Sequence, residues 1–231
     1  MKKNDFVFIL CMLAIVLPFA LVEPVGRWFS ATTAAHPYLM AFAKFAILST
    51  AGEMLGLRIK EGRYNYKGFG VFPRAVVWGI LGVGIAMAMK TFATGAPKLV
   101  ESLGVAGVCE AMAGELSWLK VLGAFAISVT MNTIFAPVFM TVHKITDGHI
   151  LNCNGSAKAL VTPFNFGEAL AGLNWRVQWG FVFKKTIPLF WYPAHTITFL
   201  LPAGFQVLFA AVLGIVLGVL LSVAANMSRG K

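Results

Sequence analysis

Charged residues are scarce in this chain. They make up 12% of its 231 residues, whereas a soluble domain carries roughly 25%. A soluble protein needs charged groups to hydrate its surface, so a water-soluble globule is excluded. Hydrophobic residues make up 58% of the sequence, and the mean hydropathy is +0.79. The composition therefore predicts that most of the molecular surface faces lipid.

Cysteine and the sequence motifs of soluble enzymes are lacking as well. The three cysteines are Cys11, Cys109 and Cys153, and no two of them have a Cys-x-x-Cys spacing. This pattern excludes a disulfide framework and a zinc ribbon. The chain also has no phosphate-binding P-loop, no His-Glu-x-x-His metal helix and no Gly-x-Ser-x-Gly nucleophile turn. We therefore expect neither an enzyme nor a cofactor.

Long apolar runs are abundant, and a membrane-spanning helix needs about 20 mostly apolar residues. The sequence predicts an all-α, polytopic transmembrane helix bundle of six spans, forming one integral membrane domain over residues 1–231. The predicted spans are residues 6–22, 37–59, 75–95, 118–142, 187–201 and 205–225. The last two are divided at Pro202, because one helix over both would be about 60 Å long. The fifth span is short, so five spans are the alternative.

The first span raises the question of a signal peptide, because it follows the sequence Met-Lys-Lys-Asn-Asp. A signal peptide has an apolar region of only about 7–15 residues. The apolar run here covers 17 residues, 6–22. We therefore expect a retained membrane anchor, with cleavage near residues 30–35 as the alternative.

The excess of positive charge indicates how the spans are oriented. The net charge is +10, from 19 Lys and Arg against 9 Asp and Glu. With an inner N-terminus, 14 of the 19 cations fall in inner segments, and only Arg27, Lys98 and Lys120 fall in outer ones. Such an excess marks the cytoplasmic loops of membrane proteins. We therefore expect both termini inside, with Cys109 and Cys153 on opposite sides of the membrane.

Two inner segments are rich in aromatic residues and cations. Residues 63–74 interleave the two kinds of side chain, which favours anchoring at lipid headgroups over nucleic-acid binding. Residues 163–185 fit both a helical and an alternating period, and we interpret them as an amphipathic helix at the inner interface. The expected partner of both segments is the anionic headgroup layer of the bilayer. No nucleic-acid partner is expected.

Ionisable and amide side chains inside the spans are the main functional signal, because a charge at the bilayer centre costs roughly 3 kcal/mol. Lys44 and Glu53 are nine residues apart in one span, so they point about 180° apart and cannot pair. Glu53 shares its helix face with Ser49 and Thr50, which directs it toward other helices. Asn132 is its expected neighbour by depth. The predicted pore-lining or gating residues are Lys44, Glu53, Asn132, His195 and Thr198.

Three potential metal ligands lie close together in an inner segment, and they are His143, Asp147 and His149. Side chains of these types bind zinc in many proteins. The dipeptide Asp147-Gly148, however, is also an ordinary turn sequence. We interpret the segment as a loop and expect no metal site.

Several short motifs carry a resemblance to a known family. They are His36-Pro37, Gly52-Glu53, Asn174-Trp175, Gln178, Trp191, Pro193, Phe199, Pro202 and Phe205. These positions resemble the motifs of the Mpv-seventeen family, whose members are small peroxisomal and mitochondrial inner-membrane proteins. The chain departs from the family pattern at Glu53 (Asp in the family), His195 (Gln), Thr198 (Asn) and Gln206 (Arg), and its first span is extra. The resemblance implies a pore-forming channel with poor selectivity for small solutes.

The expected function is therefore a channel or passive transport path for small solutes or ions. The alternative is a non-conducting membrane scaffold or assembly protein, in which the intramembrane polar groups only hold helices together. A homo-oligomer is possible in either case. The lysine-rich inner segments and the lack of an Arg- and Ser-rich transit sequence favour a bacterial cytoplasmic membrane, with an organelle membrane as the alternative.

Overall fold

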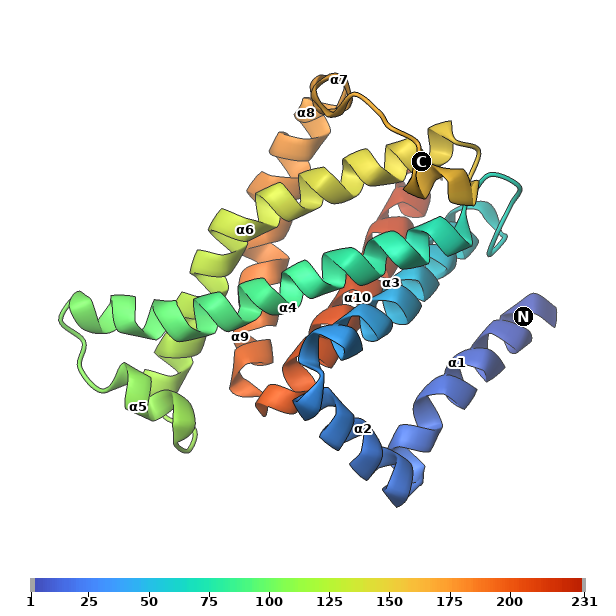
Figure 1. The fold of residues 1–231 in the computed structure, drawn as a ribbon. Helices are drawn as coiled ribbons and strands as arrows, with labels where there is room; N and C mark the ends of the chain where they lie inside the picture. The colour runs from blue at the N-terminus through green and yellow to red at the C-terminus, as the bar shows by residue number, and fades with distance from the viewer. Residues whose placement is uncertain (1–2, 230–231) are drawn as a thin grey trace.

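The computed structural model describes residues 3–229, and over that range the chain is all-helical with no β-strand (Figure 1). This confirms the predicted class. The prediction that both termini lie inside concerns residues 1–2 and 230–231, which fall outside the described residues. The side chains of residues 220–229 also fall outside the description, so the last turns of the predicted span 205–225 are known only as backbone.

Within residues 3–229, three helices are long and apolar enough to cross a membrane. They are α3 (Pro37–Glu61), α4 (Val71–Ser102) and α6 (Trp118–Asn152). Each contains one predicted span, but α4 and α6 continue well beyond the predicted ends. Their 32 and 35 residues correspond to lengths of about 48 and 52 Å. Both helices are therefore longer than the hydrocarbon core of a bilayer, which is about 30 Å thick.

The N-terminal segment forms a bent pair of helices, α1 (Lys3–Leu21) and α2 (Glu23–Ala35), which meet at 82°. If the pair is counted as one broken span, the number of candidate spans rises from three to four. Figure 1 shows the pair as a V beside α3. The open end of the V is tied to α3, because Arg58 donates two hydrogen bonds of 2.6 and 2.8 Å to Asp5.

The predicted interfacial helix over residues 163–185 does not form as one element. It contains a short helix, α7 (Phe166–Ala171), and the start of a longer helical rod over residues 175–200. This rod consists of α8 (Trp175–Val177), the π-helix η2 (Gln178–Trp191) and α9 (Tyr192–Leu200). Hydropathy placed the fifth span at 187–201 because Lys184 and Lys185 interrupt the apolar run, whereas the backbone continues through them.

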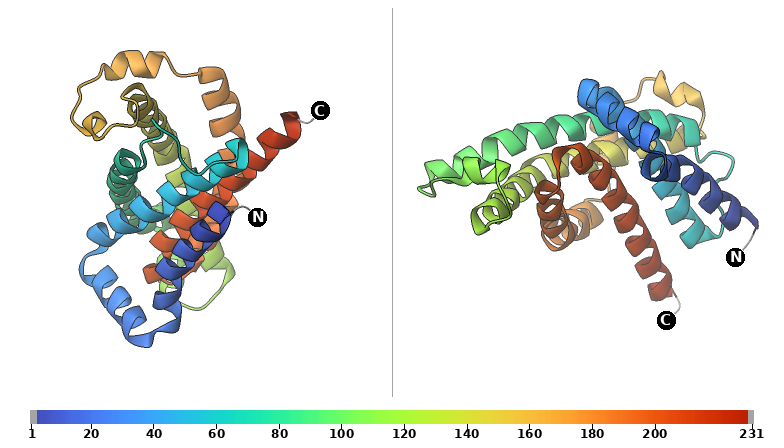
Figure 2. Two further views of the ribbon diagram at one scale, coloured as in Figure 1. Left: turned by 90° about the vertical axis from the view of Figure 1, so that its right-hand side faces the viewer. Right: turned by 90° about the horizontal axis from the view of Figure 1, so that it is seen from below.

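Small residues let the helices of the bundle approach closely. Helix α3 packs against α4 and against α10 (Ala203–Arg229), while α6 packs between α4 and α9 (Figure 1 and Figure 2). Where α4 crosses α3, Gly82 lies against the side chain of Phe45. Where α10 crosses α3, Gly52 lies against Ile215. The short helix α5 (Val108–Ala113) between α4 and α6 and the short helical turn η1 (Ala157–Leu160) after α6 complete the chain.

Candidate functional site

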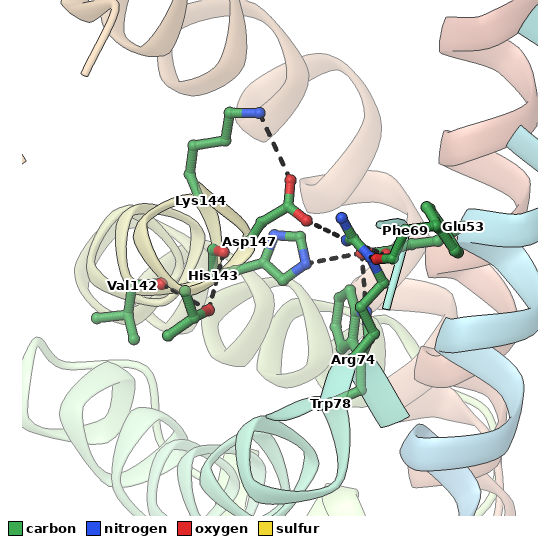
Figure 3. Close-up of polar contacts among 9 residues, drawn as sticks. Glu53, Phe69, Arg74, Trp78, Val142, His143, Lys144 and Asp147 are labelled. Atoms are coloured by element: carbon green, nitrogen blue, oxygen red, sulfur yellow. Dashed lines mark hydrogen bonds and ion pairs between the residues drawn. The ribbon is translucent and has the colours of Figure 1, made fainter. Parts of the chain in front are cut away.

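An ionic network joins α3, α4 and α6 at the end of the bundle where α3 ends and α4 begins (Figure 3). Its centre is the carboxylate of Glu53, which accepts hydrogen bonds at both oxygens. Oε2 lies 2.5 Å from Nη1 of Arg74, and Oε1 accepts from the indole N–H of Trp78 at 2.9 Å. The Nε2 atom of His143 lies 3.0 Å from the same Oε1. Glu53 therefore links three helices.

Arg74 is shared between two carboxylates. Its Nη1 atom forms an ion pair with Asp147 of α6 as well as with Glu53 of α3, and only 6% of its side chain is exposed. Its Nε atom donates to the carbonyl of Phe69 at 2.7 Å, which fixes the direction of the guanidinium. Lys144 lies 3.8 Å from the other oxygen of Asp147 and is largely exposed. The buried guanidinium of Arg74 on α4 thus pairs with one carboxylate on α3 and one on α6, and so holds these two helices together.

The network leaves almost no free space. The cavity among its side chains has a volume of about 10 Å³, which is about the volume that a single water molecule requires. Its walls include Val77, Thr146 and Ile150 in addition to the charged residues. The side chains of the ionic network are therefore closely packed.

A second polar cluster lies between α6 and α9. The side-chain amide of Asn132 donates to the carbonyl of Ser128 at 2.8 Å and contacts Nδ1 of His195 at 3.0 Å. The expectation that Asn132 lies beside Glu53 was wrong. Asn132 and His143 share a face of α6, but they are eleven positions apart, which separates them by about 16 Å along the helix.

The remaining predicted pore residues lie apart from both clusters. Lys44 is buried, donates to the hydroxyl of Thr33 at 3.2 Å and lies 4.6 Å from the ring centre of Phe29. Both partners belong to α2. The hydroxyl of Thr198 is buried and donates to the carbonyl of Ala194 in its own helix. Among the five predicted residues, a hydrogen-bond contact in the described part of the chain joins Asn132 to His195.

Four members of the ionic network were not among the predicted site residues, and they are Arg74, Trp78, His143 and Asp147. Three of them were assigned to inner loops or segments because they lie outside the apolar runs. A helical period was still present, since Arg74 and Trp78 are one turn apart, as are His143 and Asp147. That spacing is the signal that could have placed each pair on one helix face.

The possible metal ligands do not come together. Among residues 3–229, no group of three His, Cys, Asp or Glu side chains is arranged to hold a metal ion. His149 points to a different side of α6 from His143. Its ring stacks on Phe164 with the centroids 4.3 Å apart, and its Nε2 atom lies 3.0 Å from the carbonyl of Ala159. His143 and Asp147 instead belong to the ionic network.

Most positions of the family resemblance have a packing or capping role. Gly52 is one of them, because a Cβ atom there would lie 2.9 Å from Ile215. Asn174 accepts a hydrogen bond from the backbone of Val177 at the start of the rod. The indole of Trp175 donates to the carbonyl of Leu170 at 3.1 Å.

The other resemblance positions differ in burial. Two of them mark helix junctions, His36-Pro37 between α2 and α3 and Pro202 between α9 and α10. Gln178 and Phe199 are buried, whereas Phe205 is exposed. Pro193 lies in the first turn of α9. Trp191 is distinctive, because its indole nitrogen is buried and has no hydrogen-bond partner among the described residues.

A larger groove of about 540 Å³ lies on the other side of α6 from the ionic network. Its walls come from the C-terminal turns of α6 and from the segment around α7. The polar residues that line it are Lys144, His149, Asn152, Asn165, Glu168 and Asn174. Helix α6 separates this groove from Glu53.

Comparison of the chain with models of known families, with curated proteins and with solved structures returns no match. The family resemblance drawn from the motifs therefore remains a prediction. The features of this chain that bear on its function are the long apolar helices and the two polar clusters.

Proposed function

We propose that this membrane protein is a passive transport path for small solutes, and that the ionic network is its closed inner gate. The long apolar helices indicate a membrane protein. Ionisable residues within such helices are costly and commonly mark solute or ion pathways. The network places one such residue, Glu53, at the meeting point of three helices.

The observation that carries the proposal is the sharing of Arg74 by Glu53 and Asp147 in a nearly filled cavity of about 10 Å³. Burying an ion pair commonly stabilises a protein no more than apolar packing of the same volume does. Helix packing alone therefore does not require these charges. The guanidinium of Arg74 pairs with carboxylates on two different helices, and loss of these pairs together with the Glu53–His143 contact would let α3 and α6 separate.

Flux measurements on the purified protein test this proposal. Planar bilayer recording and solute uptake into proteoliposomes would compare the wild type, Glu53→Gln and the matched control Glu61→Gln. Glu61 lies on the same helix but pairs only with the exposed Arg63. A charge-assisted hydrogen bond contributes about 1.5–3 kcal/mol. Weakening it should raise the open fraction roughly tenfold or more in Glu53→Gln, with no change in the control.

The absence of conductance and of solute uptake in all three proteins, from acidic to neutral pH, would overturn the proposal. It would favour the second candidate, a non-conducting scaffold. The observation that favours a scaffold is that both carboxylate oxygens of Glu53 already have hydrogen-bond donors within the protein. A scaffold predicts that Glu53→Gln and Asn132→Leu lower the melting temperature or disrupt oligomers without any effect on flux.

The proposal also covers the membrane in which the protein lies and the family to which it is related. We place the chain in a bacterial cytoplasmic membrane, as a bacterial-type relative of the Mpv-seventeen family. The motifs around Gly52-Glu53 and Asn174-Trp175 support the relationship. The lysine-rich inner segments support the location, and anionic headgroups are the proposed partner of those segments.

A further inference from the structure

The geometry of the Asn132 amide fixes the proton position of His195. The Nδ2 atom of Asn132 lies 2.8 Å from the carbonyl oxygen of Ser128. A carbonyl oxygen can only accept, so the amide atom facing it must be the nitrogen. The same nitrogen lies 3.0 Å from Nδ1 of His195. Nδ1 is therefore the acceptor, and a neutral His195 carries its proton on Nε2.

His195 consequently presents an N–H donor at Nε2. Among the described residues, its one hydrogen-bond partner is Asn132, reached through Nδ1. The side chain as a whole is 7% exposed.

The ring of Trp191 presents a second donor beside the first. Its Nε1 atom is buried without a hydrogen-bond partner among the described residues. The two rings are neighbours one helical turn apart, with centroids separated by 4.9 Å. A buried donor without an acceptor is energetically unfavourable. Trp191 supplies one such buried donor, and the neighbouring His195 supplies an Nε2 donor that has no partner among the described residues. An acceptor from outside the chain would complete the site.

We propose that the N–H groups of Trp191 and His195 form a binding position for one oxygen acceptor of a small neutral or anionic solute. Carboxylate, amide, carbonyl and hydroxyl oxygens have the required chemistry. No carboxylate belongs to this cluster, since Glu53 and Asp147 lie in the ionic network. The two ring N–H groups themselves offer an ammonium group or metal cation no acceptor. The assignment of this acceptor as a transported solute rests on the proposed function.

The six tryptophans of the chain provide an internal scale for a test by NMR. The indole N–H groups of Trp78 and Trp175 already donate to protein oxygens at 2.9 and 3.1 Å. In ¹⁵N-labelled protein in nanodiscs, the Trp191 signal should lie upfield of these two. Assignment comes from Trp191→Phe, with Trp118→Phe as the control because Trp118 is exposed. The probes are acetate, acetamide and ethylammonium, which are similar in size and differ in charge and acceptor groups.

Acetate and acetamide should move the Trp191 signal downfield in a saturable manner, and ethylammonium should not. His195→Phe should weaken the effect of both oxygen probes while leaving the Trp78 and Trp175 signals in place, which shows that the bundle is intact. A Trp191 signal that is already downfield and insensitive to all probes would indicate a permanently held water and overturn the inference. An equal response to ethylammonium would overturn it as well.

Uptake of the same probes into proteoliposomes separates this inference from the proposed function. A shift without uptake would leave the binding position in place and refute the transport path. Uptake without a shift would support the transport path and refute the binding position. If both hold, Trp191→Phe should reduce uptake of acetate and acetamide, and Trp118→Phe should not.

Discussion

Replacing Gly82 by Ala tests whether the α3–α4 crossing positions the ionic network. An added Cβ atom at residue 82 would lie 2.6 Å from Cγ of Phe45 and would also collide with its Cβ atom. Carbon atoms in contact are normally about 3.5–4.0 Å apart. The Cβ of Phe45 is fixed to its backbone, so the collision is relieved only if the two helices separate by about 1 Å.

The magnitude follows from a comparison with Gly84→Ala in the same helix. A Cβ atom at Gly84 has no neighbour within 4 Å. Both variants gain the same helix propensity, about 1 kcal/mol for Ala over Gly. Their difference therefore isolates the overpacking cost, which is typically about 1–3 kcal/mol. Gly79→Ala should fall between them, because its Cβ would meet the outer edge of the Phe42 ring, which can rotate away.

Thermal unfolding in detergent or nanodiscs measures this series. For a chain of this size, each kcal/mol corresponds to roughly 2–4 °C in melting temperature. Gly84→Ala should melt at or above the wild type, and Gly82→Ala several degrees below Gly84→Ala. Equal melting temperatures for the two variants would refute the tight crossing, and with it the placement of Glu53 against α4.

Three further predictions concern the cysteines Cys109 and Cys153 and the N-terminal helix α1. A membrane-impermeant maleimide added to intact cells should label Cys109 but not Cys153, and the reverse labelling would refute the proposed orientation. The Glu101 carboxylate raises the pKa of the Cys109 thiol, so Glu101→Gln should speed alkylation of Cys109 near neutral pH, and an unchanged rate would contradict that contact. Asp5→Asn should speed amide hydrogen exchange in α1 roughly tenfold, because the charge-assisted bonds to Arg58 contribute about 1.5 kcal/mol or more; unchanged exchange would show that α1 is held elsewhere.

Composition and the apolar runs were sufficient to predict the all-helical class and the positions of three candidate spans. The direction of Glu53 also followed from its helix face, since the side chain does point toward α4 and α6. Periodicity gives the rotation of a residue about its own helix axis. It does not give the height at which two helices meet, and Asn132 was for that reason paired with the wrong neighbour.

The ends of the helices were not predictable from hydropathy. An apolar run ends where polar side chains begin, whereas a helix continues as long as its backbone hydrogen bonds and packing partners continue. Helix α6 runs ten residues past its predicted end at residue 142. That extension carries His143 and Asp147. A prediction based on apolar runs alone therefore left these two members of the ionic network out of the membrane helix.

The spacing of the two polar clusters along α6 makes bilayer thickness a variable that acts on this protein. Asn132 and His143 are about 16 Å apart along the helix axis, close to half of a hydrocarbon core of about 30 Å. When the first lies at the midplane, the second lies at the depth of the headgroups. The guanidinium of Arg74 is buried by the protein itself, so a thinner membrane would bring water first to the more exposed side chains of His143 and Lys144. Membrane thickness would thereby act on the rim of the ionic network rather than on its centre.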